Sequence, residues 1–160
     1  MLFRSFYPKL IKTNIHDDDM SDMATIEASI TINASPDKVW EIVSDLDSEP
    51  KFWKGTKSIR NISKEGNTVT REVTIVFKDS KCMQTVTVQP KQRILIKFTD
   101  GIINGTKTIQ LIPEGEKTKL EAIWDVKLSG MMGMFTGMIK KHIKSGTEQA
   151  LESIKQEIEK

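Results

Sequence analysis

Arg71 is the charged residue whose position most clearly suggests a role in binding. It precedes Val73, Ile75 and Phe77 at intervals of two, and polar or charged residues occupy most positions between them. Side chains two apart in a strand point to one face, so this spacing predicts that Arg71 points inward. A buried guanidinium without a partner is very costly. Arg71 therefore requires a ligand carboxylate, carbonyl or phenol, or an acidic side chain, unless a bulge or strand end turns it to solvent.

Acid–base chemistry would require titratable groups that converge, and the sequence offers few. His142 is the only histidine in the patterned part of the chain, because His16 lies near the N-terminus. A general acid or base needs a positioned partner, for which Asp125 and Glu121 are eligible. His142 stands in a lysine-rich turn of a predicted helix, where a surface position is the simpler interpretation. We therefore predict no catalytic residue and keep His142 as a candidate ligand contact.

Metal and phosphate chemistry is not predicted. Two histidines and one cysteine at unrelated spacings cannot build a metal site, and no cofactor is indicated. Gly101 and Gly105 sit at a predicted hairpin and not in a phosphate-binding loop. Cys82 lies in phase with Val86 and Val88, which predicts a small buried hydrophobe. A single cysteine excludes an intramolecular disulfide and fits a cytoplasmic location.

Residues 130–138 form an unusual segment with three glycines and four methionines. Methionine adapts to varied shapes, and each glycine weakens a helix by up to ~1 kcal/mol relative to alanine. A mobile gate that admits a ligand fits both facts, and close packing of a helix on a sheet fits them equally well. The residues of this segment that we predict to contact a ligand are Met131, Met134, Phe135 and Met138.

The composition limits the classes of protein to consider. The chain has 160 residues, of which 38% are hydrophobic and 29% charged, with a net charge of +2, as expected for one soluble globular domain. No basic stripe predicts nucleic-acid binding, and no apolar run approaches the roughly 18 residues of a membrane-spanning helix. Residues 1–24 are predicted to be a weakly ordered leader before a domain at 25–160. The alternatives for the leader are an amphipathic anchor in transient membrane contact, which Pro8 disfavours, and an overcalled start. The oligomeric state stays open.

The elements that position these residues begin with a strand at 25–33, where apolar and polar residues alternate. Ser35, Pro36 and Asp37 follow, and this order predicts the start of a short helix. Similar chemistry at 47–50 predicts a second, shorter helix that carries Phe52 and Trp53. The chain therefore crosses from the first strand to the rest of the sheet through two helices.

Residues 56–128 predict a meander of six further strands. Turn signals recur at 65–67, 78–80, 89–91, 100–101 and 113–116, about ten residues apart. Sequential strands joined by tight turns form an antiparallel sheet. After Gly130 the apolar period becomes helical and continues to Ile158. The predicted fold class is α+β, with about seven antiparallel strands and a long C-terminal helix.

The order of these elements, together with residues 34–45 (ASPDKVWEIVSD) and the pair Phe52-Trp53, resembles the START-like, Bet v 1-like helix-grip superfamily (SRPBCC). The nearest branch is similar to the polyketide cyclase/dehydrase and coenzyme Q-binding proteins. The resemblance implies a β-α-α-β6-α arrangement in which a curved sheet wraps around the terminal helix. It also implies a ligand cavity between sheet and helix, and such cavities measure roughly 300–1,000 Å³.

Three functions remain open. The first is binding or carriage of a hydrophobic molecule, such as a lipid, quinone, isoprenoid or polyketide-like compound. The second is a cyclase or dehydratase, which would need polar groups to converge from Arg71, His142 and Asp125. The third is a protein–protein adaptor that uses residues 130–138. The predicted ligand-binding residues are Trp53, Arg71, Val73, Ile75, Phe77, Phe98, Trp124, Met131, Met134, Phe135, Met138 and His142.

Overall fold

The structure, a computed structural model, describes residues 23–128 and 136–160. Seven strands alternate with short connections and precede one long helix. The strands are β1 (Met23–Ile32), β2 (Thr56–Glu65), β3 (Thr68–Ile75), β4 (Lys81–Gln89), β5 (Arg93–Asp100), β6 (Ile103–Glu114) and β7 (Lys117–Leu128). The helices are α2 (Pro36–Val43), α3 (Glu49–Phe52) and α4 (Thr136–Glu159), with 3₁₀ turns η1 (Leu46–Ser48) and η2 (Phe77–Asp79).

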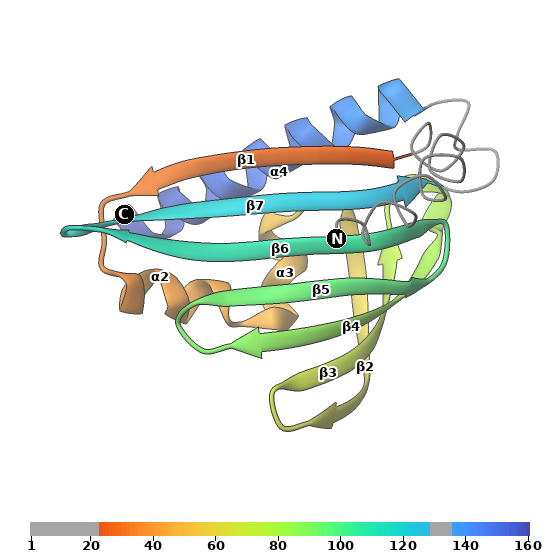
Figure 1. The fold of residues 1–160 in the computed structure, drawn as a ribbon, viewed down its shortest axis with the longest axis horizontal. Coiled ribbons are helices and arrows are strands. Elements are labelled where there is room, and N and C mark those ends of the chain that lie inside the picture. The colour runs from red at the N-terminus through yellow and green to blue at the C-terminus, as the bar shows by residue number, and fades with distance from the viewer. Residues whose placement is uncertain (1–22, 129–135) are drawn as a thin grey trace, which may run out of the picture.

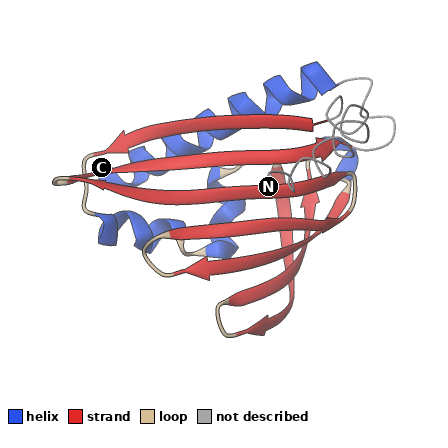
Figure 2. Ribbon diagram, in the orientation of Figure 1, coloured by secondary structure: helices blue, strands red, loops and turns tan. Residues whose placement is uncertain are grey.

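All seven strands belong to one antiparallel sheet in the order β1-β7-β6-β5-β4-β3-β2 (Figure 2). Strands β1 and β2 are neighbours in the sequence but lie at opposite edges of this sheet. The segment between them, which carries α2, η1 and α3, must therefore cross one face. Figure 1 shows these helices and α4 on the same side of the curved sheet. This arrangement confirms the predicted α+β helix-grip fold.

The predicted turns connect the strands where expected, because each contains residues that accept tight backbone geometry. Gly66 and Gly115 have φ angles of 59° and 66° in the β2–β3 and β6–β7 connections. Gly105 differs from the prediction, since it lies inside β6 and not in the hairpin turn. Its φ is 121°, and a Cβ there would clash with the Asp125 carbonyl oxygen. Only glycine lets β6 approach β7 so closely at this point.

The short helices begin as the sequence predicts. The Ser35 side chain accepts a hydrogen bond from the Lys38 amide at 3.4 Å, and Pro36 is the first residue of α2. Pro50 takes the equivalent early position in α3, which ends after Phe52. The first strand starts at Met23, two residues earlier than predicted. These helices fix the position of Glu49 and Trp53 over the sheet.

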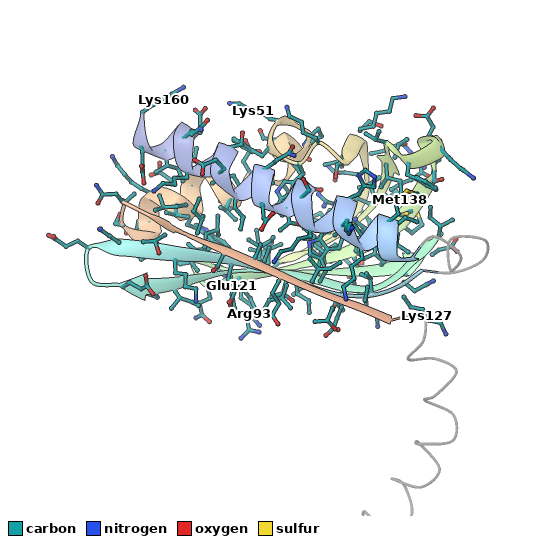
Figure 3. The ribbon with its side chains drawn as sticks, turned by 90° about the horizontal axis from the view of Figure 1, so that it is seen from above. Lys51, Arg93, Glu121, Lys127, Met138 and Lys160 are labelled. Atoms are coloured by element: carbon teal, nitrogen blue, oxygen red, sulfur yellow. The ribbon has the colours of Figure 1, made fainter. Side chains whose placement is uncertain are left out.

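Helix α4 lies along β1 and β7 and closes the core (Figure 1). Its buried side chains Ala150, Leu151 and Ile154 face the sheet. Two lysines of α4 donate to carbonyl oxygens of β1, from Lys144 Nζ to Glu27 at 2.5 Å and from Lys155 Nζ to Thr31 at 2.8 Å. Figure 3 shows Arg93 and Glu121 on the opposite, outer side of the sheet.

Candidate ligand-binding site

Arg71 is the centre of a polar cluster in the interior. It lies on β3 and is 0% exposed, so the prediction that it points inward is confirmed. Its Nη2 donates to Glu49 Oε1 at 2.6 Å, and its Nε donates to Gln84 Oε1 at 2.8 Å. Its Nη1 is buried and has no hydrogen-bond partner among the described residues. The partner that the sequence required is thus acidic, but one donor of the guanidinium remains available.

Glu49 is the first residue of α3 and stays ionised in the interior. Its carboxylate accepts from Arg71 and from the Thr56 hydroxyl, the latter at 2.9 Å. Burial by itself would raise its pKa, but the charges of Lys107 and Arg71 and these hydrogen bonds outweigh burial and lower the pKa. A negative charge is therefore held between α3 and the sheet.

Lys107 brings a second positive charge to the same region. It lies on the inner face of β6 and is 3% exposed. Its Nζ lies 3.3 Å from the ring centroid of Trp53 and 4.8 Å from that of Trp124. Burial lowers its pKa from 10.5 to about 8, opposed by the charge of Glu49 and reinforced by that of Arg71. At neutral pH, Lys107 is therefore mostly protonated but carries a larger fraction of neutral amine than an ordinary lysine.

Aromatic rings form the wall beside the polar cluster. Phe98 stacks on Trp124 with centroids 6.1 Å apart and an interplanar angle of 21°, and Trp53 meets Trp124 at 6.4 Å and 59°. The Trp124 indole donates to the Thr147 hydroxyl at 3.0 Å, and this hydroxyl donates to the Ile143 carbonyl at 2.6 Å. Helix α4 therefore fixes the orientation of the ring against which Lys107 rests.

The interior beside this cluster holds a cavity of about 40 Å³. It suffices for a few water molecules and is far smaller than the 300–1,000 Å³ of a typical ligand site. Side chains must move apart before a small molecule can occupy it. The residues that line it are Ile42, Val43, Asp45, Leu46, Glu49, Phe52, Trp53, Ile94, Ile96, Lys107, Ile109 and Ile154.

A larger depression of about 480 Å³ lies between the η1 region and strands β2 and β3. It is bordered by Asp47, Asn61 and Lys64, all exposed, and by half-exposed Ile62. We place the candidate site in the smaller interior space because buried charged groups converge there, whereas the depression is an open part of the surface with mixed polar and apolar lining.

The other predicted contacts divide between the interior and the surface. Val73 and Phe98 are buried, and Ile75, Trp53 and Trp124 are half-buried against the core. Trp53 packs over the Nζ of Lys107. Met131, Met134 and Phe135 lie outside the described residues.

The structure corrects the predicted position of two side chains, Phe77 and Met138. Phe77 is 38% exposed because β3 ends at Ile75 and the chain turns into η2, where Lys78 has a φ of 55° and alternation is lost. Met138 is 52% exposed, because it lies on the side of α4 turned away from the sheet, while its neighbour Ile139 is buried (Figure 3). His142 is exposed on α4, in agreement with the surface position that was the simpler interpretation of the sequence.

The two carboxylates considered as acid–base partners of His142 lie elsewhere in the structure. Asp125 is exposed and accepts from the Thr25 hydroxyl at 2.9 Å, and Glu121 accepts from Gln110 at 2.5 Å. Both carboxylates lie on the outer side of the sheet, whereas α4 covers the inner side. Of the three residues named for cyclase chemistry, only Arg71 reaches the interior.

Sequence reasoning missed Glu49 and Lys107 as site residues. Glu49 was interpreted only as part of a helix start. Lys107 could have been found by the same alternation that identified Arg71, since it lies in phase with Ile103, Ile109 and Leu111 on β6, all of which are buried. A charged residue in the inward phase of a strand was therefore the available signal for Lys107, as it was for Arg71.

Two further properties concern the described residues only. None of their helices is long and apolar enough to cross a membrane. They contain no group of three or more histidine, cysteine, aspartate or glutamate side chains placed to hold a metal ion.

A curved seven-stranded antiparallel sheet packed against a long terminal helix, with a charged and aromatic cluster in the interior, defines a helix-grip fold. The chain belongs to the family described as polyketide cyclase / dehydrase and lipid transport, whose model matches residues 23–159. The comparison with curated proteins found no match.

Solved structures with the same fold include proteins of several kinds. The protein TTHA0849 from Thermus thermophilus is 18% identical, with a TM-score of 0.74, over 84% of this chain and 97% of that chain. The Zhui aromatase/cyclase from Streptomyces sp. R1128 is 13% identical, with a TM-score of 0.70, over 86% and 94%. A START superfamily protein from Mycobacterium smegmatis is 17% identical, with a TM-score of 0.60, over 81% and 98%. At these identities the similarity shows the fold alone.

Proposed function

We propose that the protein binds a hydrophobic small molecule between the sheet and α4, with the polar end of the ligand facing Arg71 and Lys107. The observation that carries this proposal is the buried Nη1 of Arg71, which has no acceptor among the described residues. An unsatisfied buried donor costs about 1–3 kcal/mol, and more when it is charged. A ligand carboxylate, carbonyl or phenolate would remove this cost.

The charges of the cluster favour an acidic or electron-rich ligand group. Arg71 and Lys107 are both buried, and the carboxylate nearest to them is that of Glu49. When Lys107 is protonated, two positive charges face one negative charge. A ligand carboxylate or phenolate would balance them, while the rings of Trp53, Trp124 and Phe98 offer aromatic surface for the rest of the molecule.

The family supports a ligand of lipid, quinone, isoprenoid or polyketide type, since its description joins polyketide cyclases with lipid transport. The small cavity implies that binding requires an opening movement. Residues 130–138 are our candidate for the segment that moves to admit the ligand. At Gly137, an added Cβ would meet nothing within 4 Å, so this glycine is not required by close packing. We further propose that the protein acts in the cytoplasm, where its single, buried Cys82 stays reduced.

A matched pair of probes tests this function. Binding of 2-naphthoic acid and of 2-methylnaphthalene is followed by the fluorescence of the tryptophans. We expect both to bind, and Arg71→Met to raise the Kd of the acid about 10- to 100-fold, because a hydrogen bond to a charged group contributes about 1.5–3 kcal/mol. The Kd of the hydrocarbon should change less than about threefold. Since Arg71→Met leaves Glu49 without its ion-pair partner, Arg71→Met/Glu49→Leu, which removes both members of the pair, provides a second variant in which Lys107 is the remaining buried charge of the cluster.

Equal losses for the two probes would show that Arg71 does not contact the polar group. Failure of the parent protein to bind either probe at its solubility limit would contradict a ligand site of this chemistry. The exposed Arg60→Met, which disrupts only a surface pair with Glu72, is the matched control and should leave both affinities unchanged.

A cyclase or dehydratase is the second candidate, because Glu49, Arg71 and Lys107 converge in the interior. An amine with a pKa near 8 can remove a proton from the carbon next to a carbonyl, and a guanidinium can stabilise the enolate that forms. Incubation with a poly-β-ketone and detection of aromatic product by absorbance tests this reaction. Product formation that is lost in Lys107→Met supports the enzyme, and recovery of the unchanged ketone supports the carrier.

A further inference from the structure

Lys107 differs from the other charged residues of the interior in its contacts. Arg71 and Glu49 form an ion pair at 2.6 Å, whereas Lys107 makes no ion pair or hydrogen bond with any residue in the described part of the chain. Its partners are the faces of two indole rings, and its side chain lines the interior cavity. A primary amine is thus presented, without a fixed acceptor, to the space where we place the ligand.

We propose that Lys107 captures an aldehyde or ketone ligand by forming a reversible imine between its Nζ and the carbonyl carbon. This proposal rests on the proposed ligand-binding function and adds the chemical class of the ligand. It turns a non-covalent pocket into one that retains carbonyl compounds selectively.

The step balances without an oxidant or cofactor. The lone pair of neutral Nζ attacks the carbonyl carbon, and the oxygen takes up the proton that the nitrogen loses, which gives a carbinolamine. Loss of this oxygen as one molecule of water forms the carbon–nitrogen double bond. Hydrolysis reverses both steps and releases the ligand and the free lysine.

The surroundings of Nζ suit the product of this reaction. A protonated imine keeps its positive charge on the nitrogen, so the faces of Trp53 and Trp124 continue to stabilise it as they do the ammonium group. Glu49, which also lines the cavity, supplies a negative charge that favours the protonated imine. Burial among apolar side chains limits access of the water that would hydrolyse the imine.

The supply of neutral amine sets the pH range of the reaction. Burial lowers the pKa of Lys107 to about 8, with Glu49 of α3 acting against this shift and Arg71 of β3 adding to it. Asp45, before η1, is the other ionisable side chain that borders the cavity. At pH 7.5 the neutral fraction of Lys107 exceeds that of an ordinary lysine more than about a hundredfold.

Reductive trapping with 2-naphthaldehyde and sodium cyanoborohydride at pH 7.5 tests the proposal. A trapped imine adds the mass of one aldehyde less one oxygen atom, which intact-protein mass spectrometry detects and peptide mapping locates. We expect labelling of Lys107 at least about tenfold above any other lysine, with a rate that rises to half its maximum near pH 8.

Three variants interpret the labelling. Lys107→Met removes the amine, and Lys107→Arg keeps a cation that forms no imine, so both should lose the selective adduct. Lys97→Met is the control, because Lys97 is exposed on β5 in the outward phase. It should label as the parent does. Circular dichroism establishes that each variant is folded.

Binding of 2-methylnaphthalene, which has no carbonyl, separates the two proposals. If this hydrocarbon binds and the aldehyde displaces it, but the adduct is spread over surface lysines, the covalent proposal is overturned and the binding function stands. If neither molecule binds and no selective adduct forms, both are overturned. A selective adduct that the hydrocarbon suppresses supports both.

Discussion

The two halves of the interior solve the same packing problem in opposite ways. Beneath α4, the inner faces of β1 and β7 carry Ile26, Leu120 and Ala122, and α4 adds Ala150 and Leu151, all 2% exposed or less. We call this the apolar half. Beneath α3, the same alternation of β3, β4 and β6 turns charged and amide groups inward, and we call this the polar half. Its defining residues are Glu49, Arg71, Gln84 and Lys107.

The difference between the two halves indicates that the apolar half mainly stabilises the fold and that the polar half is suited to binding. Apolar burial contributes roughly 25 cal/mol per Å² and needs no partners. Buried charges lose hydration, and a well-packed apolar replacement is often as stable or more so. The polar half also leaves one arginine donor unpaired and one lysine with a lowered pKa. Groups perturbed in this way cluster at functional sites, so the polar half is the region where we expect the ligand.

Replacement of Glu49 should cause the largest loss of stability, because it removes the carboxylate of the polar half. Glu49→Leu leaves Arg71 and Lys107 as two buried positive charges without a carboxylate, and we expect the free energy of unfolding to fall by about 3–5 kcal/mol. Urea denaturation measures this loss. Asp79→Asn, which disrupts the exposed pair with Lys57, is the control and should cost at most about 1 kcal/mol. Similar small losses for both variants would contradict a buried role for Glu49.

A truncation in the apolar half should cost nearly as much but leave the site intact. Leu151 is 1% exposed, so Leu151→Ala should lower the free energy of unfolding by about 3 to 4 kcal/mol through lost contacts and a residual cavity. Below the unfolding midpoint, the affinity for 2-methylnaphthalene should stay within about twofold of the parent. A larger change in affinity would show that the two halves are energetically coupled.

The pH dependence of the free energy of unfolding tests the lowered pKa of Lys107. Its pKa is about 8 in the folded protein and 10.5 ordinarily, so between these values the unfolded chain holds a proton that the folded protein has released. Stability should therefore rise with pH over this window, by up to about 3 kcal/mol. Lys107→Met should lack this rise. Cys82, whose pKa is raised by burial, opposes the rise equally in both proteins and cancels in the difference. A difference between the two proteins that does not vary from pH 7 to 10.5 would contradict the lowered pKa.

His142 should show the smallest effect. Its side chain is exposed, so His142→Ala should change the free energy of unfolding by less than about 0.5 kcal/mol and leave the binding of both naphthalene probes unchanged. The same urea and fluorescence measurements apply. A clear loss of binding would show that the N-terminal part of α4 contacts the ligand, and it would support the same role for residues 130–138.

The sequence predicted the fold far better than the site, for a physical reason. Alternation and turn residues are local signals, and they were sufficient to predict seven strands, two short helices and the terminal helix. The same local signal placed Arg71 inward. It failed at Phe77, where a positive φ at Lys78 ends the alternation, and it could not reveal that Glu49 meets Arg71, because that contact depends on how α3 lies over the sheet. Neither could spacing predict that Trp53 covers Lys107.

The position of β1 also has a consequence for how the chain is made. Among the strands that the structure describes, β1 is paired with β7 alone, and contacts between the two join residues 100 apart in the sequence, such as Thr25 and Asp125. The Asn33 amide donates to Glu159 at 2.7 Å, across 126 residues. At typical rates of synthesis, β1 must wait roughly 5–20 s on the ribosome before β7 exists. During this interval its apolar face has no native partner, so the emerging chain should depend on chaperones until α4 has been translated and the sheet edge can close.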